Sequence, residues 1–544
     1  MRKISLIACA FIAIAFHSCK TENDLTGEIP FEMELLKGPL FIGRENPDII
    51  KIQFEINESL GALNLKTIEL VFEKESQHGF LESIDVVIHH FSENDTISGK
   101  FETKLIKGKN KIRLQGSRVF EPGAYELSLG LFVKDQAPLN QSFSIENVEL
   151  SFGRKGRLVL KPETDFRFRP AIVLRAAGQD NCDTYRIPGI ITTSKGTLIA
   201  VYDNRYNNSK DLQEDIDVGM SRSTDGGQTW EPMRVIMDMG EWGGRPPRLN
   251  GIGDPAVLYD HTTGTIWVAA LWISGSLPDK MLWWDSKPGL SPEETGQFVL
   301  VKSTDDGLNW SEPINITEQI KDPEWQLLLA GPGMGITLDD GTLIFAAQFK
   351  EDIGVQAIDG GQYTCHSTIV YSNDGGETWQ MGTGAKPNTT EAQVVQMADG
   401  SLMLNMRDDL NRRVKDETNG RAVAITRDMG QTWEIHPSSN SALPEPNCMA
   451  SLIAQNVRMN GEDKQVLFFS NPNDKHQRIN MTIKASFDGG NTWPEANQML
   501  LNAAPGFGYS CMTMVDDQTI GIVYEGVKEL FFQKIPVKEF QKKL

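Results

Sequence analysis

The chain has 544 residues, of which 40% are hydrophobic, and a formal net charge of -20 at pH 7. This length exceeds what one hydrophobic core usually serves, so we expect two domains. The acidic balance, without a long run of lysine or arginine, argues against a surface that binds nucleic acid or anionic lipid, so an anionic ligand would have to be bound by a few locally placed arginines.

The chain begins with a predicted targeting segment over residues 1–19. Arg2 and Lys3 precede an apolar run over residues 4–16 that is too short to span a bilayer. The run leads to Cys19 in a context similar to a lipoprotein cleavage site, where Cys19 would carry a lipid anchor. We therefore predict export, as a periplasmic or outer-membrane lipoprotein, with secretion as the alternative. No later stretch is apolar enough to predict a transmembrane span.

Residues 20–165 are predicted to form an N-terminal β-sandwich accessory domain. Short runs that alternate apolar and polar side chains, such as 49–54 and 125–129, are typical of strands with one buried face. Residues with catalytic chemistry do not cluster here. The role of this domain stays open between carbohydrate binding and a packing or spacer function.

From residue 166 onward, an octapeptide of the form Ser/Thr-x-Asp-x-Gly-x-Thr/Asn-Trp recurs. Five copies of so restrictive a pattern indicate a repeat architecture. Asp can accept hydrogen bonds from turn amides, Gly supplies a backbone conformation that other residues resist, and Trp covers the turn. We interpret the copies as structural turns, because a calcium loop would need further carboxylates and a terminal Glu. The copies lie at 223–230, 303–310, 372–379, 426–433 and 486–493.

Six predicted strand-turn-strand hairpins alternate with these octapeptides and give the number of repeats. The first five are each followed by an octapeptide, and an early strand such as Ala171 to Leu174 could complete the sixth. We therefore predict an all-β chain in which a six-bladed β-propeller over 166–544 follows the β-sandwich. The hairpins are predicted over 189–202, 256–270, 334–348, 393–406, 451–470 and 511–524.

Counting from the hairpin turns places the polar candidates in space, because residues equally distant from a turn lie at the same end of a sheet. Arg186 and Arg205 stand about nine residues either side of Lys195-Gly196, roughly 25–30 Å from that turn. If turns and octapeptides share one face, the opposite face gathers arginines, an acid and a tyrosine. These residues are Arg186, Arg205, Glu391, Arg407, Arg478 and Tyr509.

The chain from about residue 166 to 544 resembles the Asp-box sialidases, also called neuraminidases. The resemblance rests on Tyr185-Arg186-Ile187-Pro188, the five Asp boxes, the Glu391 and Arg407 pair, Arg478 and Tyr509. It implies an exo-α-sialidase, a glycoside hydrolase whose partners are sialylated glycans. It also assigns the carboxylate-binding arginine triad to Arg186, Arg407 and Arg478. A guanidinium suits this task because it presents a rigid fork and keeps its charge.

The same resemblance assigns the catalytic groups. Tyr509 matches the nucleophile and Glu391 the base that takes its proton, because a phenol with a pKa near ~10 needs activation at neutral pH. A tyrosine suits an anomeric carbon that already bears a carboxylate. Asp211 is the best match for the acid/base. Arg205 resembles a further substrate-side arginine, and Asp254 resembles a pocket-lining residue, with a turn cap as the alternative.

The predicted reaction is retaining hydrolysis with no metal or organic cofactor, because arginine and tyrosine supply the charge and the nucleophile. A trans-sialidase or intramolecular trans-sialidase would keep the same residues and resolve the intermediate differently. A non-catalytic propeller that only binds sialic acid is the other alternative. The pairing of Glu391 with Tyr509 argues against that alternative, because a lectin does not need an activated phenol.

Overall fold

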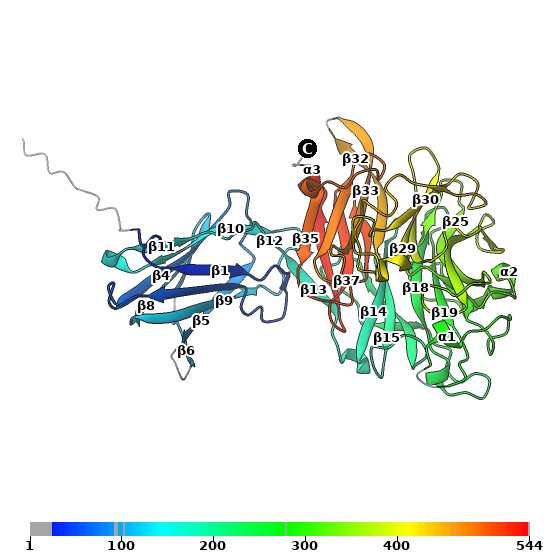
Figure 1. Ribbon diagram of the computed structural model, residues 1–544, viewed down its shortest axis with the longest axis horizontal. Coiled ribbons are helices and arrows are strands. Elements are labelled where there is room, and N and C mark those ends of the chain that lie inside the picture. The colour runs from blue at the N-terminus through cyan, green and yellow to red at the C-terminus, as the bar shows by residue number, and fades with distance from the viewer. Residues whose placement is uncertain (1–23, 92–95, 102–103, 278–279, 460, 542–544) are drawn as a thin grey trace, which may run out of the picture.

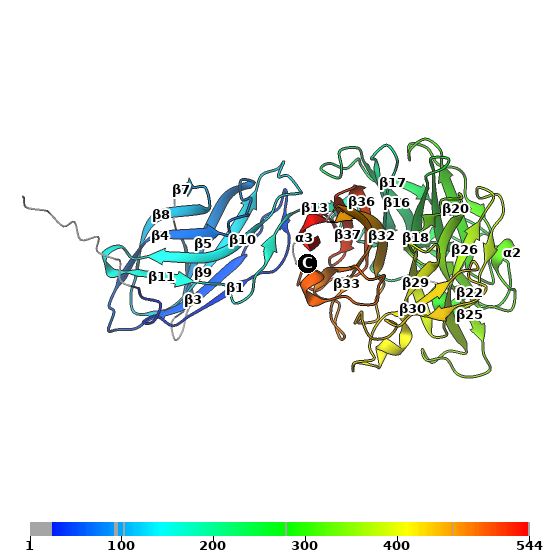
Figure 2. The same cartoon turned by 90° about the horizontal axis from the view of Figure 1, so that it is seen from above.

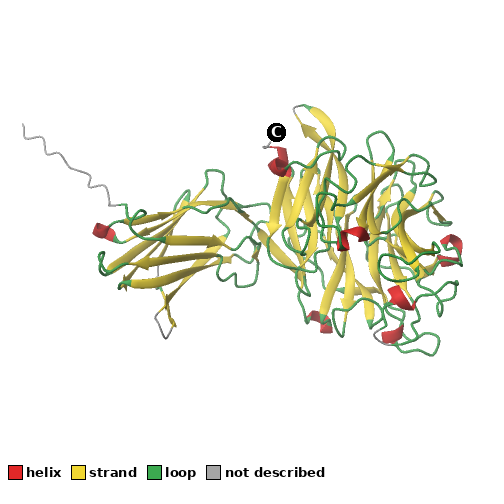
Figure 3. Cartoon of the chain, in the orientation of Figure 1, coloured by secondary structure: helices red, strands yellow, loops and turns green. Residues whose placement is uncertain are grey.

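The computed structural model describes residues 24–91, 96–101, 104–277, 280–459 and 461–541 (Figure 1). The predicted targeting segment and Cys19 lie outside these residues. Strands dominate throughout (Figure 3), and the α-helices have four residues each. Within the described ranges, no helix is long and apolar enough to cross a membrane. The predicted all-β class is confirmed. The α-helices are α1 (Leu282–Asp285), α2 (Thr317–Ile320) and α3 (Lys538–Gln541).

Two antiparallel sheets near the N-terminus pack around one core. Alternation of apolar and polar side chains builds this core, as in β3, where Ile50, Ile52, Phe54 and Ile56 are buried. The same hydrophobic cluster includes residues from both sheets. One sheet orders β1 (Phe31–Leu35), β3 (Ile50–Ile56), β9 (Gly123–Val133), β5 (Leu81–Phe91) and β6 (Thr96–Lys100). The other orders β11 (Arg157–Leu160), β10 (Phe143–Ser151), β4 (Leu63–Phe72), β8 (Lys111–Phe120) and β7 (Lys104–Lys107), and β12 (Arg167–Phe168) pairs with β10.

Six further sheets of four or five strands make up the rest of the described chain. The first orders β14 (Thr184–Thr192), β15 (Leu198–Arg205), β16 (Ile216–Ser223) and β17 (Arg234–Met237). The second orders β21 (Ile314–Asn315), β20 (Gln297–Ser303), β19 (Thr265–Trp272), β18 (Ile252–Asp260) and β23 (Gly333–Met334). The third orders β22 (Leu327–Ala330), β25 (Leu343–Asp352), β26 (Tyr363–Ser372) and β27 (Gln380–Met381), with β24 (Ile336–Thr337) beside β25.

The last three sheets follow the same plan. The fourth orders β28 (Thr389–Gln396), β29 (Leu402–Asp408), β30 (Ala422–Thr426) and β31 (Glu434–Ile435). The fifth orders β32 (Ser451–Met459), β33 (Glu462–Pro472), β34 (Met481–Ser486) and β35 (Gln498–Asn502). The sixth orders β2 (Leu40–Phe41), β13 (Pro170–Arg175), β38 (Leu530–Pro536), β37 (Thr519–Glu525) and β36 (Ser510–Asp516). The early strand expected at Ala171 to Leu174 thus does join the last sheet, through β13 and β38.

One strand of each of these sheets meets its counterparts in the neighbouring sheets. Contacts run from β14 to β18, from β18 to β25, and onward through β28, β32 and β36 back to β14. Figures 1 and 2 show the sheets following one another through the C-terminal part of the molecule. Each sheet is open, and the ring of contacts joins separate sheets. The six strands therefore surround a common centre.

The octapeptides are turns in the structure, as predicted. In the first copy, Asp225 accepts hydrogen bonds from the Thr229 amide at 2.9 Å and from the Ser223 hydroxyl at 2.8 Å. Gly226 and Gly227 take φ values of 69° and 86°, which other residues resist. The Trp230 indole donates to the Gly227 carbonyl at 3.1 Å. The motif thus stabilises its own turn, and none of its five copies lines the cavity described below.

The N-terminal sheets and the last sheet are joined by more than a linker. Strand β2 comes from the predicted accessory domain, yet it pairs in parallel with β13. Arg44 of the N-terminal part pairs with Glu529 at 2.7 Å, and within the C-terminal part the buried Arg169 forms an ion pair with Glu539 of α3. The predicted boundary at residue 165 stays a prediction. Strand pairing crosses it twice, because β2 pairs with β13 and β12 pairs with β10.

Candidate active site

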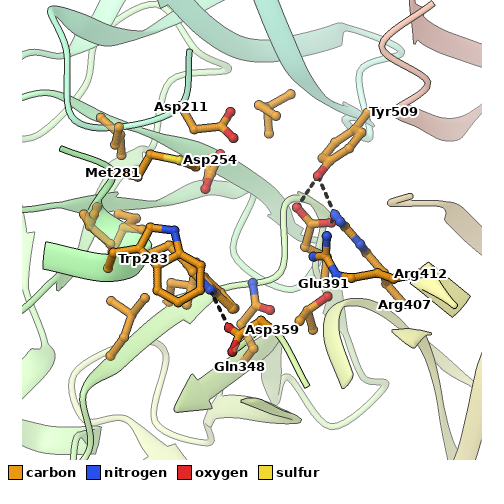
Figure 4. Close-up of a pocket in the computed structure, with 18 of the residues that line it drawn as sticks. Asp211, Asp254, Met281, Trp283, Gln348, Asp359, Glu391, Arg407, Arg412 and Tyr509 are labelled. Atoms are coloured by element: carbon orange, nitrogen blue, oxygen red, sulfur yellow. Dashed lines mark hydrogen bonds and ion pairs between the residues drawn. The ribbon is translucent and has the colours of Figure 1, made fainter. Parts of the chain in front are cut away.

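A cavity of about 460 Å³ opens where the ring of inner strands ends (Figure 4). Three β-bulges lie on inner strands at this end, and each shifts the register of its hairpin. They fall at residues 186–189 of β14, 253–256 of β18 and 389–392 of β28. Bulges re-aim side chains, and Ile187, Asp254 and Glu391 from these three segments all line the cavity.

Tyr509, Glu391 and Arg407 form the centre of one cavity wall (Figure 4). The Tyr509 hydroxyl donates a short hydrogen bond to Oε1 of Glu391. Arg407 donates through NH1 to Oε2 of Glu391 at 2.6 Å and to the phenolic oxygen at 3.1 Å. Asn447 accepts a further hydrogen bond from NH2 of Arg407 at 2.8 Å. The phenol therefore has a carboxylate positioned to take its proton.

Two more arginines flank the Tyr509 ring. The guanidinium carbon of Arg186 lies 5.0 Å from the ring centroid and that of Arg478 lies 5.6 Å from it. Burial and the charge of Glu391 raise the pKa of Tyr509 well above its ordinary value, while Arg407, Arg478 and Arg186 act in the opposite direction. The phenol is therefore neutral at neutral pH and surrounded by three positive charges.

Glu525 accepts hydrogen bonds from both the Arg186 side chain and the Tyr509 backbone. Its Oε1 accepts from Nε of Arg186 at 3.1 Å and from the Ile187 amide at 2.9 Å, and its Oε2 accepts from the Tyr509 amide at 2.8 Å. NH2 of Arg186 is buried and has no hydrogen-bond partner. A buried cationic donor without a partner is costly, and an anionic ligand would satisfy it.

Asp211 lies on a loop beside the same arginine. Its Oδ1 accepts from NH1 of Arg186 at 3.2 Å and from NH1 of Arg205 at 2.7 Å, and its side chain is 51% exposed. Burial opposes ionisation, but the nearby Arg205 and Arg186 prevail and lower the pKa of Asp211. Asp211 is therefore the accessible carboxylate at this side of the cavity.

Arg205 differs from the expectation of a substrate-side arginine. Its side chain is only 1% exposed, and it lies between Asp203 and Asp211. Like Arg186 and Arg478, it is absent from the residues that line the cavity, and its guanidinium donates to Asp203, Asp211 and the Ser209 carbonyl. The buried guanidinium therefore binds Asp211 from the protein interior and helps to fix the position of that carboxylate.

Asp254 lines the cavity as a half-buried residue with an unusual backbone. Its φ is 55°, and its amide donates to Oδ1 of Asp203 at 2.9 Å. Burial, followed by the charges of Asp203 and Asp211, raises the pKa of Asp254 well above its ordinary value. The raised pKa favours the protonated side chain, which can donate a hydrogen bond into the cavity.

The structure brings the eight residues singled out in the sequence together at and around the cavity. Arg186 and Arg478 flank the nucleophile candidate, and Arg205 lies behind Asp211. The remaining five line the cavity itself: Asp211, Asp254, Glu391, Arg407 and Tyr509. Four cysteines, Cys182, Cys365, Cys448 and Cys511, are buried and free. In the described part of the chain, no three His, Cys, Asp or Glu side chains are grouped to hold a metal ion.

The opposite cavity wall was not found from the sequence. Met281, Trp283 and Trp284 come from the segment at α1 and give this wall an apolar character. The Trp283 indole donates to Asp359 at 3.0 Å, and Nζ of Lys350 lies 3.5 Å from the same carboxylate and 4.0 Å from the Trp283 ring. The run Met281-Leu282-Trp283-Trp284 in a polar loop was the signal that could have indicated this wall.

Known proteins resemble this chain over most of its length. Residues 196–523 match the family model of a BNR repeat-like domain. A sialidase of Bacteroides fragilis (strain YCH46) is 46% identical over 435 residues, which cover 80% of this chain and 77% of that protein. The solved structure of Hadza microbial sialidase Hz136 is 38% identical with a TM-score of 0.79, covering 93% of this chain and 99% of that one. An intramolecular trans-sialidase from Ruminococcus gnavus shares the fold at 18% identity and a TM-score of 0.53, over 67% of this chain and 97% of that one.

An all-β fold with a phenol hydrogen-bonded to a carboxylate and converging arginines at one cavity, in a chain 46% identical to a sialidase, identifies a glycoside hydrolase. The chain belongs to the bacterial exo-α-sialidase family.

Proposed function

We propose that this chain hydrolyses terminal α-linked sialic acid from glycans with retention of configuration, using Tyr509 as the nucleophile. The observation that carries the proposal is the hydrogen bond from the Tyr509 hydroxyl to Glu391, beside Arg407 and inside the cavity. A buried phenol paired with a carboxylate supports nucleophilic catalysis, because the carboxylate can take the proton that keeps the phenol unreactive.

Substrate binding rests on the three arginines around Tyr509. Sialic acid carries a carboxylate on its anomeric carbon, and guanidinium groups bind carboxylates through parallel hydrogen bonds. NH2 of Arg186 and Nε of Arg407 are buried donors without a hydrogen-bond partner. A carboxylate bound by Arg186, Arg407 and Arg478 would bring the anomeric carbon next to the phenolic oxygen.

In the first chemical step, the Tyr509 oxygen forms a bond to the anomeric carbon and its proton passes to Glu391. The bond to the leaving oxygen breaks, and that oxygen takes a proton from Asp211. A sialic acid carboxylate bound to Arg186 would offset the positive charge that keeps the pKa of Asp211 low. The pKa of Asp211 then rises, which suits its role as an acid.

In the second step, Asp211 takes a proton from water, whose oxygen bonds to the anomeric carbon. The bond to Tyr509 breaks, and the phenolate recovers its proton from Glu391. Two displacements at one carbon restore the original configuration. A tyrosine nucleophile is the recognised exception to the two-carboxylate scheme, because a carboxylate would be repelled by the anionic sugar.

We also infer that the six C-terminal sheets are the blades of a six-bladed β-propeller. Support comes from the cyclic contacts among β14, β18, β25, β28, β32 and β36, and from β13 joining the last sheet. A β-sandwich domain over 20–165 and a propeller over 166–544 complete this proposal. Export by residues 1–19, with a lipid anchor at Cys19 in a periplasmic or outer-membrane lipoprotein or secretion as the alternative, is proposed from the sequence alone.

The experiment that tests the function is an assay with an aryl α-sialoside, with the released sugar followed by NMR. We expect the α-anomer of free sialic acid to be released first. Tyr509→Phe should reduce turnover strongly while the protein stays folded by circular dichroism. Release of an anhydro sugar would favour an intramolecular trans-sialidase, and wild-type turnover in the variant would remove the nucleophile assignment.

A further inference from the structure

Two buried carboxylates hold strained backbone at the cavity in the same way. Ile187 and Asp254 each precede a proline, lie in a bulge of an inner strand, and have positive φ values of 57° and 55°. Such values are unusual for any residue other than glycine. Each amide is held by a buried carboxylate, Ile187 by Glu525 at 2.9 Å and Asp254 by Asp203 at 2.9 Å. The structure therefore contains two equivalent clamps.

The second clamp does more than hold one amide. Asp203 is fully buried, and its other oxygen, Oδ2, accepts from NH2 of Arg205 at 2.8 Å and from Nε at 3.1 Å. NH1 of the same guanidinium donates to Asp211 at 2.7 Å and to the Ser209 carbonyl at 2.8 Å. One buried carboxylate thus fixes Asp254 through its backbone and Asp211 through Arg205.

Gly253 leaves room for this arrangement. A Cβ at position 253 would lie 2.9 Å from Oδ1 of Asp203 and 3.2 Å from its Cγ, closer than side chains tolerate. The carboxylate can approach the Asp254 amide only because the preceding residue is glycine. In the sequence Gly253-Asp254-Pro255, Gly253 leaves space for the Asp203 carboxylate, and Asp254 is the strained residue whose amide that carboxylate binds.

We propose that Asp203, which has no access to the cavity, is a positioning residue that sets the places of both Asp211 and Asp254. This inference rests on the proposed function, because it assigns Asp203 to the proton transfer that Asp211 performs. Loss of Asp203 leaves Arg205 without its main partner, so Arg205 and Asp211 can shift together. Protonation of the leaving oxygen then suffers more than attack by Tyr509, whose hydroxyl is hydrogen-bonded to Glu391 and Arg407 and not to Arg205 or Asp203.

The test compares two substrates that differ in their need for an acid. 4-Nitrophenol leaves readily as an anion, whereas the sugar hydroxyl of sialyllactose needs a proton in order to leave. For Asp203→Asn we expect kcat/KM to fall at least about tenfold more for sialyllactose than for the 4-nitrophenyl sialoside, since general acid catalysis contributes ~10²–10⁴-fold. Gly253→Ala displaces Asp203 without removing its charge and should give the same bias, with a smaller loss.

Asp306→Asn is the matched control for damage to stability. Asp306 is another buried aspartate that pairs with an arginine, Arg222, at 2.7 Å, and it lies in an octapeptide turn. We expect this variant to lose thermal stability without any bias between the substrates. Equal losses on both substrates in Asp203→Asn and Gly253→Ala would overturn the positioning role. A wild-type protein that cleaves neither substrate would instead reject the proposed function, so the two failures are distinguishable.

Discussion

Glu391→Gln removes the proposed base with little change in shape. The carboxylate now accepts from both the Tyr509 hydroxyl and Arg407. A glutamine amide can still accept from Arg407, but its nitrogen donates to the phenolic oxygen and cannot take the proton. Removal of a positioned base costs ~10²–10⁴-fold in rate. At about 1.36 kcal/mol for each factor of ten, the barrier rises by about 3–5 kcal/mol.

The same substitution also changes stability, and the two effects must be separated. The side chains of Arg407 and Glu391 are 12% and 13% exposed, so the lost charge costs on the order of 1–2 kcal/mol while the hydrogen bond to Arg407 remains. Glu539→Gln is a suitable control, because Glu539 is 14% exposed and pairs with buried Arg169 away from the cavity. Steady-state kcat on an aryl α-sialoside, together with Tm, should show comparable Tm losses and a rate loss confined to Glu391→Gln. Equal kcat values in the two variants would refute the role of Glu391.

Three other predictions concern charges elsewhere in the chain. Burial and the charges of Asp203 and Asp211 raise the pKa of Asp254. The protonated Asp254 therefore contributes to folding stability at pH values below the ordinary pKa of aspartate, and this contribution is lost as pH rises. The Tm of Asp254→Asn relative to wild type should increase from pH 4 to pH 8, and a constant difference would contradict this. Arg169→Ala removes the ion pair with Glu539 of α3, whose remaining partner Arg167 lies 3.9 Å away, so denaturant titration should show a loss of about 1.5–3 kcal/mol with kcat unchanged. Hydrogen bonds within the octapeptide turns lower the pKa of three aspartates to about 2. The free energy of unfolding, followed by circular dichroism, should therefore keep its full contribution from these turns above pH ~4 and lose it as pH falls toward 2. Unfolding already complete at pH 4 would argue against these turns as stabilisers. The three aspartates are Asp305, Asp374 and Asp428.

The all-β class, the turn chemistry and the residues near Tyr509 could be predicted from local patterns. Glycine and aspartate at fixed offsets specify a turn wherever they occur, and distance from the turn gives the end of the sheet on which a residue lies. This counting correctly placed Glu391, Arg407 and Tyr509 at one end of their hairpins. Their hydrogen bonds to one another depend on packing between separate sheets.

Features that depend on packing between distant segments could not be predicted in the same way. Arg205 is at the expected end of its strand, yet the depth of its side chain is fixed by Asp203 on one side and Asp211 on the other. The bulges at Ile187 and Asp254 need buried carboxylates from other strands, which strand counting does not reveal. The pairing of β2 with β13 likewise joins segments 130 residues apart, counted from Leu40 to Pro170.

The identity of the nucleophile is the central claim, and a mechanism-based label tests it most directly. A 2,3-difluorosialic acid slows the second displacement, so a covalent sugar adduct should accumulate on the enzyme. Peptide mass spectrometry of the wild-type protein should then locate the adduct on Tyr509, and Tyr509→Phe should carry none. An adduct on Glu391 or Asp211, or steady turnover in the variant, would contradict the account.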